Sequence, residues 1–310
     1  MTGYLIDYKG NEYKLPVLFS WSVVHTMGVP SDNFEISCPY DGAMRETLSD
    51  ATCFRGIWRG DTVFYGVVDE YEVNINENGR TVSIAGRGNG ARLLDNESEA
   101  MEYGACSLED ILTNHVRPCG ITEINAEPMP VVSSYTVQNG SSQWKALEEF
   151  CRYSEGVLPR FSKDGRLVLS KRAGEKRKLG GAVYDINLRE KRHGIISEIL
   201  VKDTYLGTSG IVENAEFIAR GGACRRIITV PRKTGYDAMR YTGRYQIEQS
   251  KKDSFVLSLT VPKLFAAFPN DTVEINLAGL GITGEFKVNE TECWADGRGA
   301  GTRMKLAKSE

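Results

Sequence analysis

The chain has 310 residues, of which 41% are hydrophobic and 25% charged, and its formal net charge at pH 7 is −3. This length can hold one large domain or two to three ordinary ones, and the composition is that of a soluble globular protein. No apolar run approaches the roughly 18 residues of a membrane span, and the first residues lack the basic and apolar stretches of a signal peptide, so we expect neither.

Short strands separated by turns fill the first part of the chain. Residues 3–18 predict a β-hairpin that turns at Lys9, Gly10 and Asn11, residues 19–27 predict a further strand, and residues 34–38 alternate apolar and polar side chains up to Pro39. Together with the strands after residue 50, this makes six or seven strands in about 87 residues, which is typical of a barrel or a sandwich.

The segment 51–97 organises this region. It predicts a strand, a tight turn at residues 59–61, a long strand, a second turn at residues 76–79, and a third strand. In the long strand Val63, Tyr65 and Val67 point to one face, and Phe64 and Val68 point to the other. Because both faces carry large apolar residues, we expect a closed or two-sided β structure.

A glycine-rich segment ends this region. Gly86-x-Gly88-x-x-Ala91 follows a strand, as does the loop that binds the pyrophosphate in dinucleotide folds. However, an acidic segment follows where a long apolar helix would be needed, and a β meander precedes it instead of a βαβ unit. We therefore expect no cofactor here, and interpret the glycines as a turn that needs positive φ.

Residues 96–182 change in character. Ser107 is a candidate N-cap for a short helix that ends at Pro118, and residues 120–135 predict an irregular crossing. A strand at residues 135–138 and a second helix capped by Ser141 or Ser142 follow. The apolar face of that helix contains Trp144, Leu147, Phe150 and Cys151. A hairpin over residues 157–170 completes a small α/β domain.

Strands return from about residue 183. The candidates are residues 195–205, 216–220, 225–230, 255–261, 271–277, 282–292 and 302–306. Residues 236–251 predict an inserted helix, which Gly243 weakens. We therefore expect domains at 1–95, 96–182 and 183–310. Identity between the two β regions is too low to define a repeat, although their similar strand counts permit one.

Charge is unevenly distributed along the chain. Residues 1–130 hold 9 Lys/Arg against 20 Asp/Glu, whereas residues 152–192 hold 12 against 5. This asymmetry suggests complementary surfaces between copies or with other proteins. The basic run that could form such an assembly interface comprises Lys171, Arg172, Lys176, Arg177 and Lys178. The run has no interleaved aromatics, so a solvated loop or a protein interface is favoured over contact with nucleic acid.

Motifs for catalysis are absent from the sequence. His115 lies near Cys106 and Cys119, which hints at a metal, but Pro118 breaks the helix that would align them and no fourth ligand is evident. Nothing near the scattered thiols would activate a nucleophile, and carboxylates are too numerous in residues 69–127 to single out an acid/base pair. We predict no catalytic, cofactor-binding or metal residues. Seven unclustered cysteines favour reduced thiols in a cytoplasm: Cys38, Cys53, Cys106, Cys119, Cys151, Cys224 and Cys293.

Several phrases of the sequence resemble one known family. They are FRGIWRGDTVFYGVVD at residues 54–69, VSIAGR with LLD at residues 82–95, VQNGSSQW at residues 137–144 with DGRLVL at residues 164–169, and LSLTVP at residues 257–262 with DTV at residues 271–273. The chain thereby resembles the baseplate hub proteins of contractile phage tails and phage-tail-like bacteriocins, the late control protein D type. Gly88 and Asn89 depart from the Ser or Asp that is usual in the family.

The resemblance implies a mainly β (α+β) fold, with two antiparallel β-barrel tail-hub domains flanking a small α/β helix-plus-hairpin domain. It implies a homotrimer that forms a pseudo-sixfold ring with a central channel, located in a virion or tail-like particle and assembled in the bacterial cytoplasm. The implied partners are the tail tube protein, the central spike protein and other baseplate or tape-measure proteins, with nucleic acid only as cargo through the channel. No cofactor and no enzymatic activity are implied.

Two other functions stay open at this point. A stand-alone β-barrel module that binds polysaccharide or nucleic acid would be monomeric and would bind polymers. A tail-associated cell-wall hydrolase would cleave peptidoglycan and would depend on one carboxylate.

Overall fold

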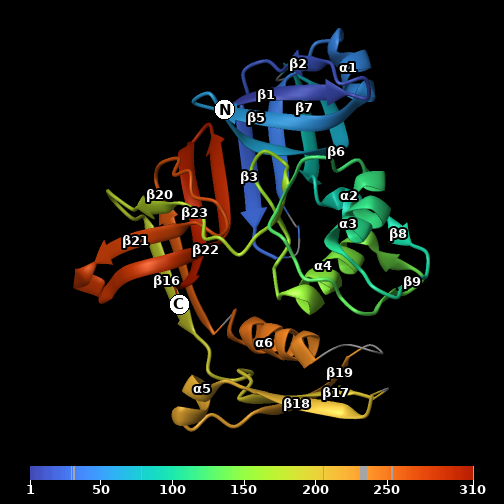
Figure 1. Ribbon diagram of the computed structural model, residues 1–310. Coiled ribbons are helices and arrows are strands. Elements are labelled where there is room, and N and C mark those ends of the chain that lie inside the picture. The colour runs from blue at the N-terminus through green and yellow to red at the C-terminus, as the bar shows by residue number, and fades with distance from the viewer. Residues whose placement is uncertain are drawn as a thin grey trace.

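A computed structural model of the chain describes residues 1–309 except 29, 31, 78, 205, 231–235 and 253. Figure 1 shows a β region formed by the N-terminal residues, a second β region beside it, a mixed α/β domain, and a small helix-and-sheet unit at the end remote from the first region. Within the described residues no helix is long and apolar enough to cross a membrane. The predicted strand at residues 195–205 and the turn at residues 76–79 each include one residue outside the described set.

The first β half occupies residues 1–88. Its strands and helix are β1 (Thr2–Asp7), β2 (Glu12–Lys14), β3 (Ser20–Thr26), β4 (Asn33–Pro39), α1 (Met44–Asp50), β5 (Ala51–Trp58), β6 (Asp61–Asn76) and β7 (Gly79–Gly88). The predicted strands are therefore confirmed, whereas α1 was not predicted. Burial alternates residue by residue in β1, β3 and β4, as it does in strands with one face in a core.

Stacked aromatic rings form the centre of this half. Phe34 and Phe54 stack with their ring centroids 4.3 Å apart, and Phe64 lies 5.3 Å from Phe34. All three side chains are almost fully buried. Offset aromatic packing of this kind adds to the free energy gained from burial alone.

The middle domain occupies residues 89–170. Its elements are α2 (Ala91–Leu94), β8 (Glu97–Ser98), β9 (Met101–Tyr103), α3 (Leu108–Ile111), η1 (Leu112–Val116), η2 (Arg117–Cys119), β10 (Ile124–Ala126), β11 (Tyr135–Val137), β12 (Ser141–Ser142), α4 (Gln143–Ser154), β13 (Arg160–Phe161) and β14 (Leu167–Leu169). Both predicted N-caps are confirmed: Ser107 forms a capping box with Asp110, and Ser142 accepts a hydrogen bond from the backbone N–H of Lys145. The predicted face of α4 is buried in the core of this domain.

The second β half is formed by β15 (Lys176–Lys178), β16 (Asp185–Glu190), β20 (Phe255–Val261), β21 (Thr272–Leu277), η3 (Ala278–Leu280), β22 (Ile282–Asp296) and β23 (Gly299–Lys308). The last four strands confirm the prediction. The short or charged strands β15 and β16 were not predicted. Because β15 pairs with β21, the second half begins before residue 183.

An inserted unit separates β16 from β20. It contains β17 (Glu198–Asp203), β18 (Thr208–Glu213), α5 (Ala215–Ala219), β19 (Arg225–Val230) and α6 (Tyr236–Lys252). The strand predicted at residues 216–220 is wrong, because Asn214 caps a helix there by accepting a hydrogen bond from the N–H of Phe217. Gly243 has a packing role in α6: an added Cβ would lie 2.6 Å from Val212 on the sheet below.

The two β halves repeat one topology. The first half pairs in the order β3-β4-β7-β6-β5-β1, and the second in the order β16-β20-β23-β22-β21-β15. The chain visits the corresponding strands in the same sequence, and both long hairpins carry an irregularity at matching places, between Val68 and Glu70 and between Val288 and Glu290. One pairing differs, since β1 is antiparallel to β5 whereas β15 is parallel to β21. The repeat that the strand counts permitted is therefore present in the topology.

The two halves join into one sheet through antiparallel pairing of β3 with β22. The mainly β fold is thus confirmed. Backbone pairing among the described strands does not close either half into a barrel, so the two barrels stay a prediction.

Close backbone contact explains the glycine segment that follows β7. Gly86, Gly88 and Gly90 have no positive φ, so the predicted positive-φ turn is wrong. Instead, a Cβ added to Gly86 would lie 2.0 Å from the carbonyl oxygen of Val67, and one added to Gly90 would lie 2.4 Å from Pro30. The glycines allow neighbouring segments to approach more closely than any side chain would permit.

Candidate functional site

The predicted interface residues lie in a basic linker, residues 171–178, that connects the middle domain to the second β half. Its last three residues form β15, which runs parallel to β21 along residues 272–274. Such a short strand gains little from its own pairing, so side chains must hold it in place.

One buried carboxylate anchors this linker. Asp271 is 6% exposed. It accepts hydrogen bonds from the backbone N–H of Glu175 at 2.9 Å, from Nε of Arg177 at 2.8 Å and from the backbone N–H of Phe268 at 3.0 Å. Asn270 adds a fourth contact by donating to the carbonyl oxygen of Arg172 at 2.8 Å. Charge-assisted hydrogen bonds of this kind are among the stronger polar contacts in proteins.

The other four basic side chains also have acidic partners in the same chain. The ion pairs are Lys171–Glu155 at 3.6 Å, Arg172–Glu127 at 2.8 Å, Lys176–Glu285 at 3.1 Å and Lys178–Glu274 at 3.4 Å. All four cations remain at least half exposed, so each pair contributes little to stability. The structure therefore brings all five predicted residues into one linker, and their contact with another copy stays a prediction.

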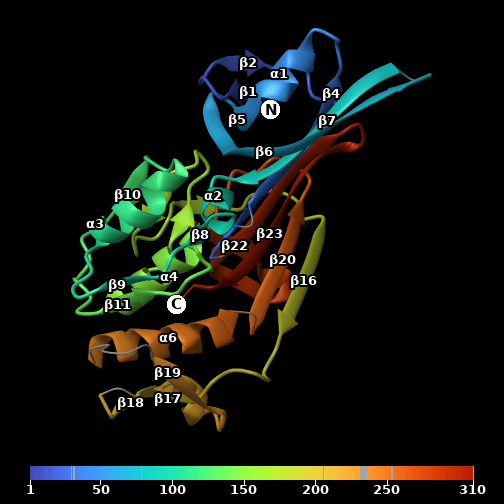
Figure 2. The same ribbon diagram turned by 90° about the vertical axis from the view of Figure 1, so that its right-hand side faces the viewer.

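Two of the open strand edges lie on β6 and β16 of the long sheet, and sequence reasoning did not identify them. β6 pairs with β5 only up to Val67, so residues 69–76 have β7 on one side and no strand among the described residues on the other. We call residues 69–76 of β6, with residues 79–85 of β7, the arm; Figure 2 shows it projecting from the body. The second open edge is β16, the outermost strand at the far end of the same sheet.

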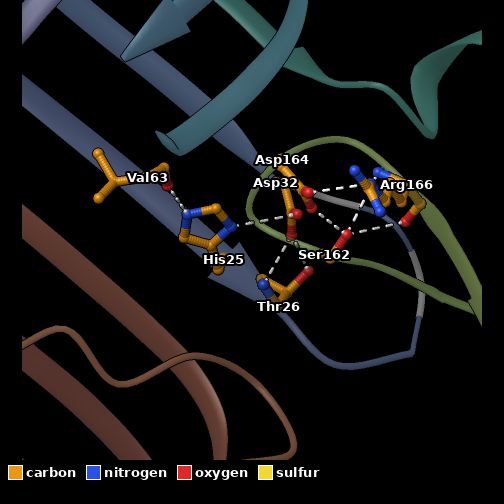
Figure 3. Close-up of polar contacts among 7 residues, drawn as sticks. All are labelled: His25, Thr26, Asp32, Val63, Ser162, Asp164 and Arg166. Carbon is orange, nitrogen blue, oxygen red and sulfur yellow. Dashed lines mark hydrogen bonds and ion pairs between the residues drawn. The ribbon is translucent and has the colours of Figure 1, made fainter. Parts of the chain in front are cut away.

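A histidine and a carboxylate meet where the first half contacts the middle domain (Figure 3). His25 lies with Nδ1 3.4 Å from the carboxylate of Asp32 and Nε2 2.9 Å from the carbonyl oxygen of Val63. Ser162 is drawn with them in Figure 3, but its hydroxyl donates a hydrogen bond to the carboxylate of Asp164 at 2.5 Å and not to His25. The serine thus belongs to a separate turn, so these residues do not form a Ser-His-Asp triad.

Two buried thiols and a second histidine are also in structural positions. Burial raises the pKa of the Cys38 thiol to about 11 and that of Cys106 to about 12, so both are protonated at neutral pH. His115 contacts the hydroxyl of Tyr103 at 2.9 Å and Oε1 of Gln143 at 2.7 Å, and burial lowers its pKa. Among the described residues, no three His, Cys, Asp or Glu side chains are placed to hold a metal ion.

Comparison with known proteins follows the same division of the chain. Residues 91–171 match the family model of the baseplate hub protein gp44-like, second domain. This range coincides with the middle domain and its separate core. No curated protein matches the sequence.

Solved structures resemble the whole chain. A tail protein from Neisseria meningitidis is 16% identical, covers 99% of this chain and 96% of its own, and has a TM-score of 0.78. The 43 kDa tail protein of prophage MuSo2 from Shewanella oneidensis is 18% identical, with coverage of 99% and 98% and a TM-score of 0.75. An E. coli component of the type VI secretion system, itself similar to the T4 tail proteins gp27 and gp5, is 9% identical, with coverage of 94% and 74% and a TM-score of 0.63.

The resemblance of the sequence to baseplate hub proteins is therefore confirmed: residues 91–171 match the second domain of the gp44-like hub proteins, and the chain as a whole has the fold of phage tail proteins.

Proposed function

We propose that this protein is a structural baseplate hub that forms a homotrimeric, pseudo-sixfold ring and adapts a tail tube to a trimeric spike. The repeated topology of the two β halves carries this proposal. Three copies of a chain with two similar halves supply six similar units, which can face a sixfold tube on one side while the chain itself remains threefold.

The hub acts by assembly and not by catalysis. Its proposed partners are the tube protein, the spike, and other baseplate or tape-measure proteins, in a phage tail or a bacteriocin-like particle. Support comes from the type VI and phage tail proteins that share the fold. A monomer that binds polymers would favour a binding module, and peptidoglycan cleavage that depends on one carboxylate would favour a hydrolase.

Light scattering of the purified chain tests the trimer. We expect a solution mass of about 103 kDa, three times 34.4 kDa, for the chain alone or with its spike. A stable dimer, or a strict monomer in both samples, would contradict the proposed function. The chain alone is measured first, because it separates self-assembly from recruitment by the spike.

Charge reversal tests the predicted basic interface. Lys176→Glu with Lys178→Glu changes two exposed side chains whose partners, Glu285 and Glu274, are also half exposed. We expect normal folding but a weaker trimer, because two added acids per copy would repel an acidic neighbour. The trimer fraction is measured across a dilution series. An unchanged series would remove these two lysines from the interface. Arg177 is kept intact, since its ion pair with Asp271 belongs to the fold.

A further inference from the structure

The strand pairing that connects the two halves implies a second pairing of the same kind, which one chain cannot make alone. We call the antiparallel β3–β22 pairing, and its repeat, a joint. Within the chain, β3 pairs with β22. In the repeat, β3 corresponds to β16 and β22 corresponds to β6. The same joint, repeated once more, would pair β16 with β6, and these are the two open edges described above.

The two hairpins can be superposed residue by residue. Val68 is opposite Gly86 and Glu70 is opposite Ala85, with Asp69 as the extra residue. Likewise Val288 is opposite Leu306 and Glu290 is opposite Lys305, with Asn289 as the extra residue. Residue 70 of β6 therefore corresponds to residue 290 of β22, and residues 71–75 correspond to 291–295.

The other strand is aligned in the same way. Trp21 and Val23 of β3 are opposite Ile36 and Phe34, and Ile186 and Leu188 of β16 are opposite Leu259 and Leu257. β4 and β20 in turn share a register, because Ile36 faces Ile84 and Leu259 faces the corresponding Met304. Residue 21 thus corresponds to residue 186, residue 23 to 188, and residue 26 to 191.

The register of a β6–β16 joint follows from the β3–β22 joint. Glu290, Glu292, Cys293 and Ala295 are opposite Thr26, Val24, Val23 and Trp21. Replacing each residue by its counterpart gives Glu70 with Lys191, Glu72 with Arg189, Val73 with Leu188, and Ile75 with Ile186. The two remaining pairs of the joint, Thr291 with His25 and Trp294 with Ser22, give Tyr71 with Glu190 and Asn74 with Asn187. Of these six pairs, two join opposite charges and two join apolar side chains, although the alignment used only backbone pairing and no side-chain chemistry. Opposite charges and β-branched or aliphatic pairs are the combinations that stabilise neighbouring strands.

The arm lacks the cations that its counterpart has. Glu290 and Glu292 of β22 pair at 2.8 Å with Lys305 and Arg303 on the neighbouring strand. The corresponding positions next to Glu70 and Glu72 are Ala85 and Ser83. Among the described residues neither arm glutamate forms an ion pair. The same holds for Arg189 in β16 and for Lys191 directly after it. Within the part of the chain that the structure describes, the arm and the β16 edge thus carry charges of opposite sign that form no ion pair.

Exposure differs between the two joints in the manner that a missing partner would produce. Val23 is 3% exposed in the joint within the chain, whereas its counterpart Leu188 is 48% exposed. Thr291 is 1% exposed, whereas its counterpart Tyr71 is 43% exposed, and Ile75 is 65% exposed. An open strand edge with exposed apolar residues is a site for pairing with another chain.

We propose that the arm of one copy pairs antiparallel with β16 of a second copy of this chain, in the register Glu70–Lys191, Glu72–Arg189, Val73–Leu188 and Ile75–Ile186. The contact is head-to-tail, because it joins different surfaces of the two copies, so it generates a ring if the rotation between copies closes. This inference rests on the proposed function and specifies which edges hold the ring together.

Charge reversal and charge exchange test the ion pairs. In the arm variant Glu70→Lys with Glu72→Lys, like charges face each other across the joint, and we expect the dissociation constant of the trimer to rise at least about tenfold. The strand variant Lys191→Glu with Arg189→Glu should have a similar effect. The variant with all four changes exchanges the charges and should regain most of the lost affinity. The matched control, Glu99→Lys with Glu102→Lys, makes the same charge change at exposed sites of the middle domain and should assemble normally.

A disulfide tests the register. Val73→Cys with Leu188→Cys places two thiols directly opposite each other between copies, and oxidation should yield covalent dimers and trimers on a denaturing gel. Val73→Cys with Asn187→Cys shifts the pairing by one residue to the other face and should not cross-link. The parent protein under the same oxidation controls for its seven cysteines, all of which are buried or half-buried.

The outcomes separate this inference from the proposed function. If the parent chain is monomeric even with its spike, the proposed function fails. If the parent chain is trimeric, but the arm variant assembles normally and the matched thiols do not cross-link, the trimer stands and the β6–β16 joint is wrong. Loss of assembly in both charge variants, recovery in the exchanged variant and register-specific cross-linking would together support the joint.

Discussion

A valine at position 86 is expected to prevent the first β half from folding. A Cβ at Gly86 would lie 2.0 Å from the carbonyl oxygen of Val67 and 2.7 Å from the ring of Phe34. Neither neighbour can move freely, because Val67 belongs to the β6–β7 ladder and Phe34 is stacked on Phe54 in the core. We expect a loss of more than about 4 kcal/mol in the free energy of unfolding, seen as aggregation or as the absence of a cooperative thermal transition.

Gly104→Val is the matched control for this substitution. An added Cβ there meets no atom within 4 Å, and the residue does not have positive φ. Its midpoint of thermal unfolding should stay within a few degrees of the parent value, about the effect of an ordinary surface substitution. A soluble Gly86→Val protein that unfolds at the parent temperature would show that the two strands are further apart than described here.

Removing the carboxylate of Asp271 is expected to release the basic linker from the second β half. Asp271→Ala deprives two backbone N–H groups and the Arg177 guanidinium of their acceptor in a mostly buried site. Breaking such a buried, hydrogen-bonded charge pair costs about 3–5 kcal/mol. Chemical denaturation should show that loss, and limited proteolysis should cleave the chain within residues 171–178 while both flanking regions remain folded.

Glu274→Ala provides the comparison on the same strand. Its carboxylate pairs with Lys178 at 3.4 Å, but both side chains are at least half exposed. The free energy of unfolding should change by no more than about 0.5 kcal/mol. Equal losses in the two variants would mean that the linker is held by general electrostatics and not by the buried site at Asp271.

Local sequence patterns predicted the elements whose stability is local. The alternating residues of β4, the two capped helices and the long hairpins all carry their signal in neighbouring residues. The strands β15 and β16 carry none: β15 is Lys-Arg-Lys, and β16 has charged residues at half of its positions. Both are strands because a distant segment pairs with them, and such pairing leaves no trace in the local sequence.

Sequence patterns pointed to charge as the basis of the candidate interface, and contact of that interface with another copy stays a prediction. The charge asymmetry correctly pointed to an acidic first region and a basic middle region, yet the basic run with the most obvious pattern finds its acids within the chain. Arg189 in β16 and Lys191 directly after it form no ion pair among the described residues, and they lie in a segment that was not predicted to be a strand. Which charges are satisfied internally depends on the register of distant strands, which composition does not reveal.

One inequality between the two halves would decide how many equivalent positions a ring offers to other proteins. Between β3 and β4 the chain needs only residues 27–32, whereas between the corresponding β16 and β20 it carries the whole inserted unit, whose Tyr245 hydroxyl donates to Glu148 of the middle domain at 2.6 Å. In a ring of six similar halves, this lobe would appear on every second half, once per 120° of rotation. A partner that contacts only the shared β surfaces would meet six near-identical positions, while one that contacts the lobes would meet three. The inserted unit would thus distinguish alternate halves of the ring. A threefold ligand that contacts it could then dock in only one set of orientations.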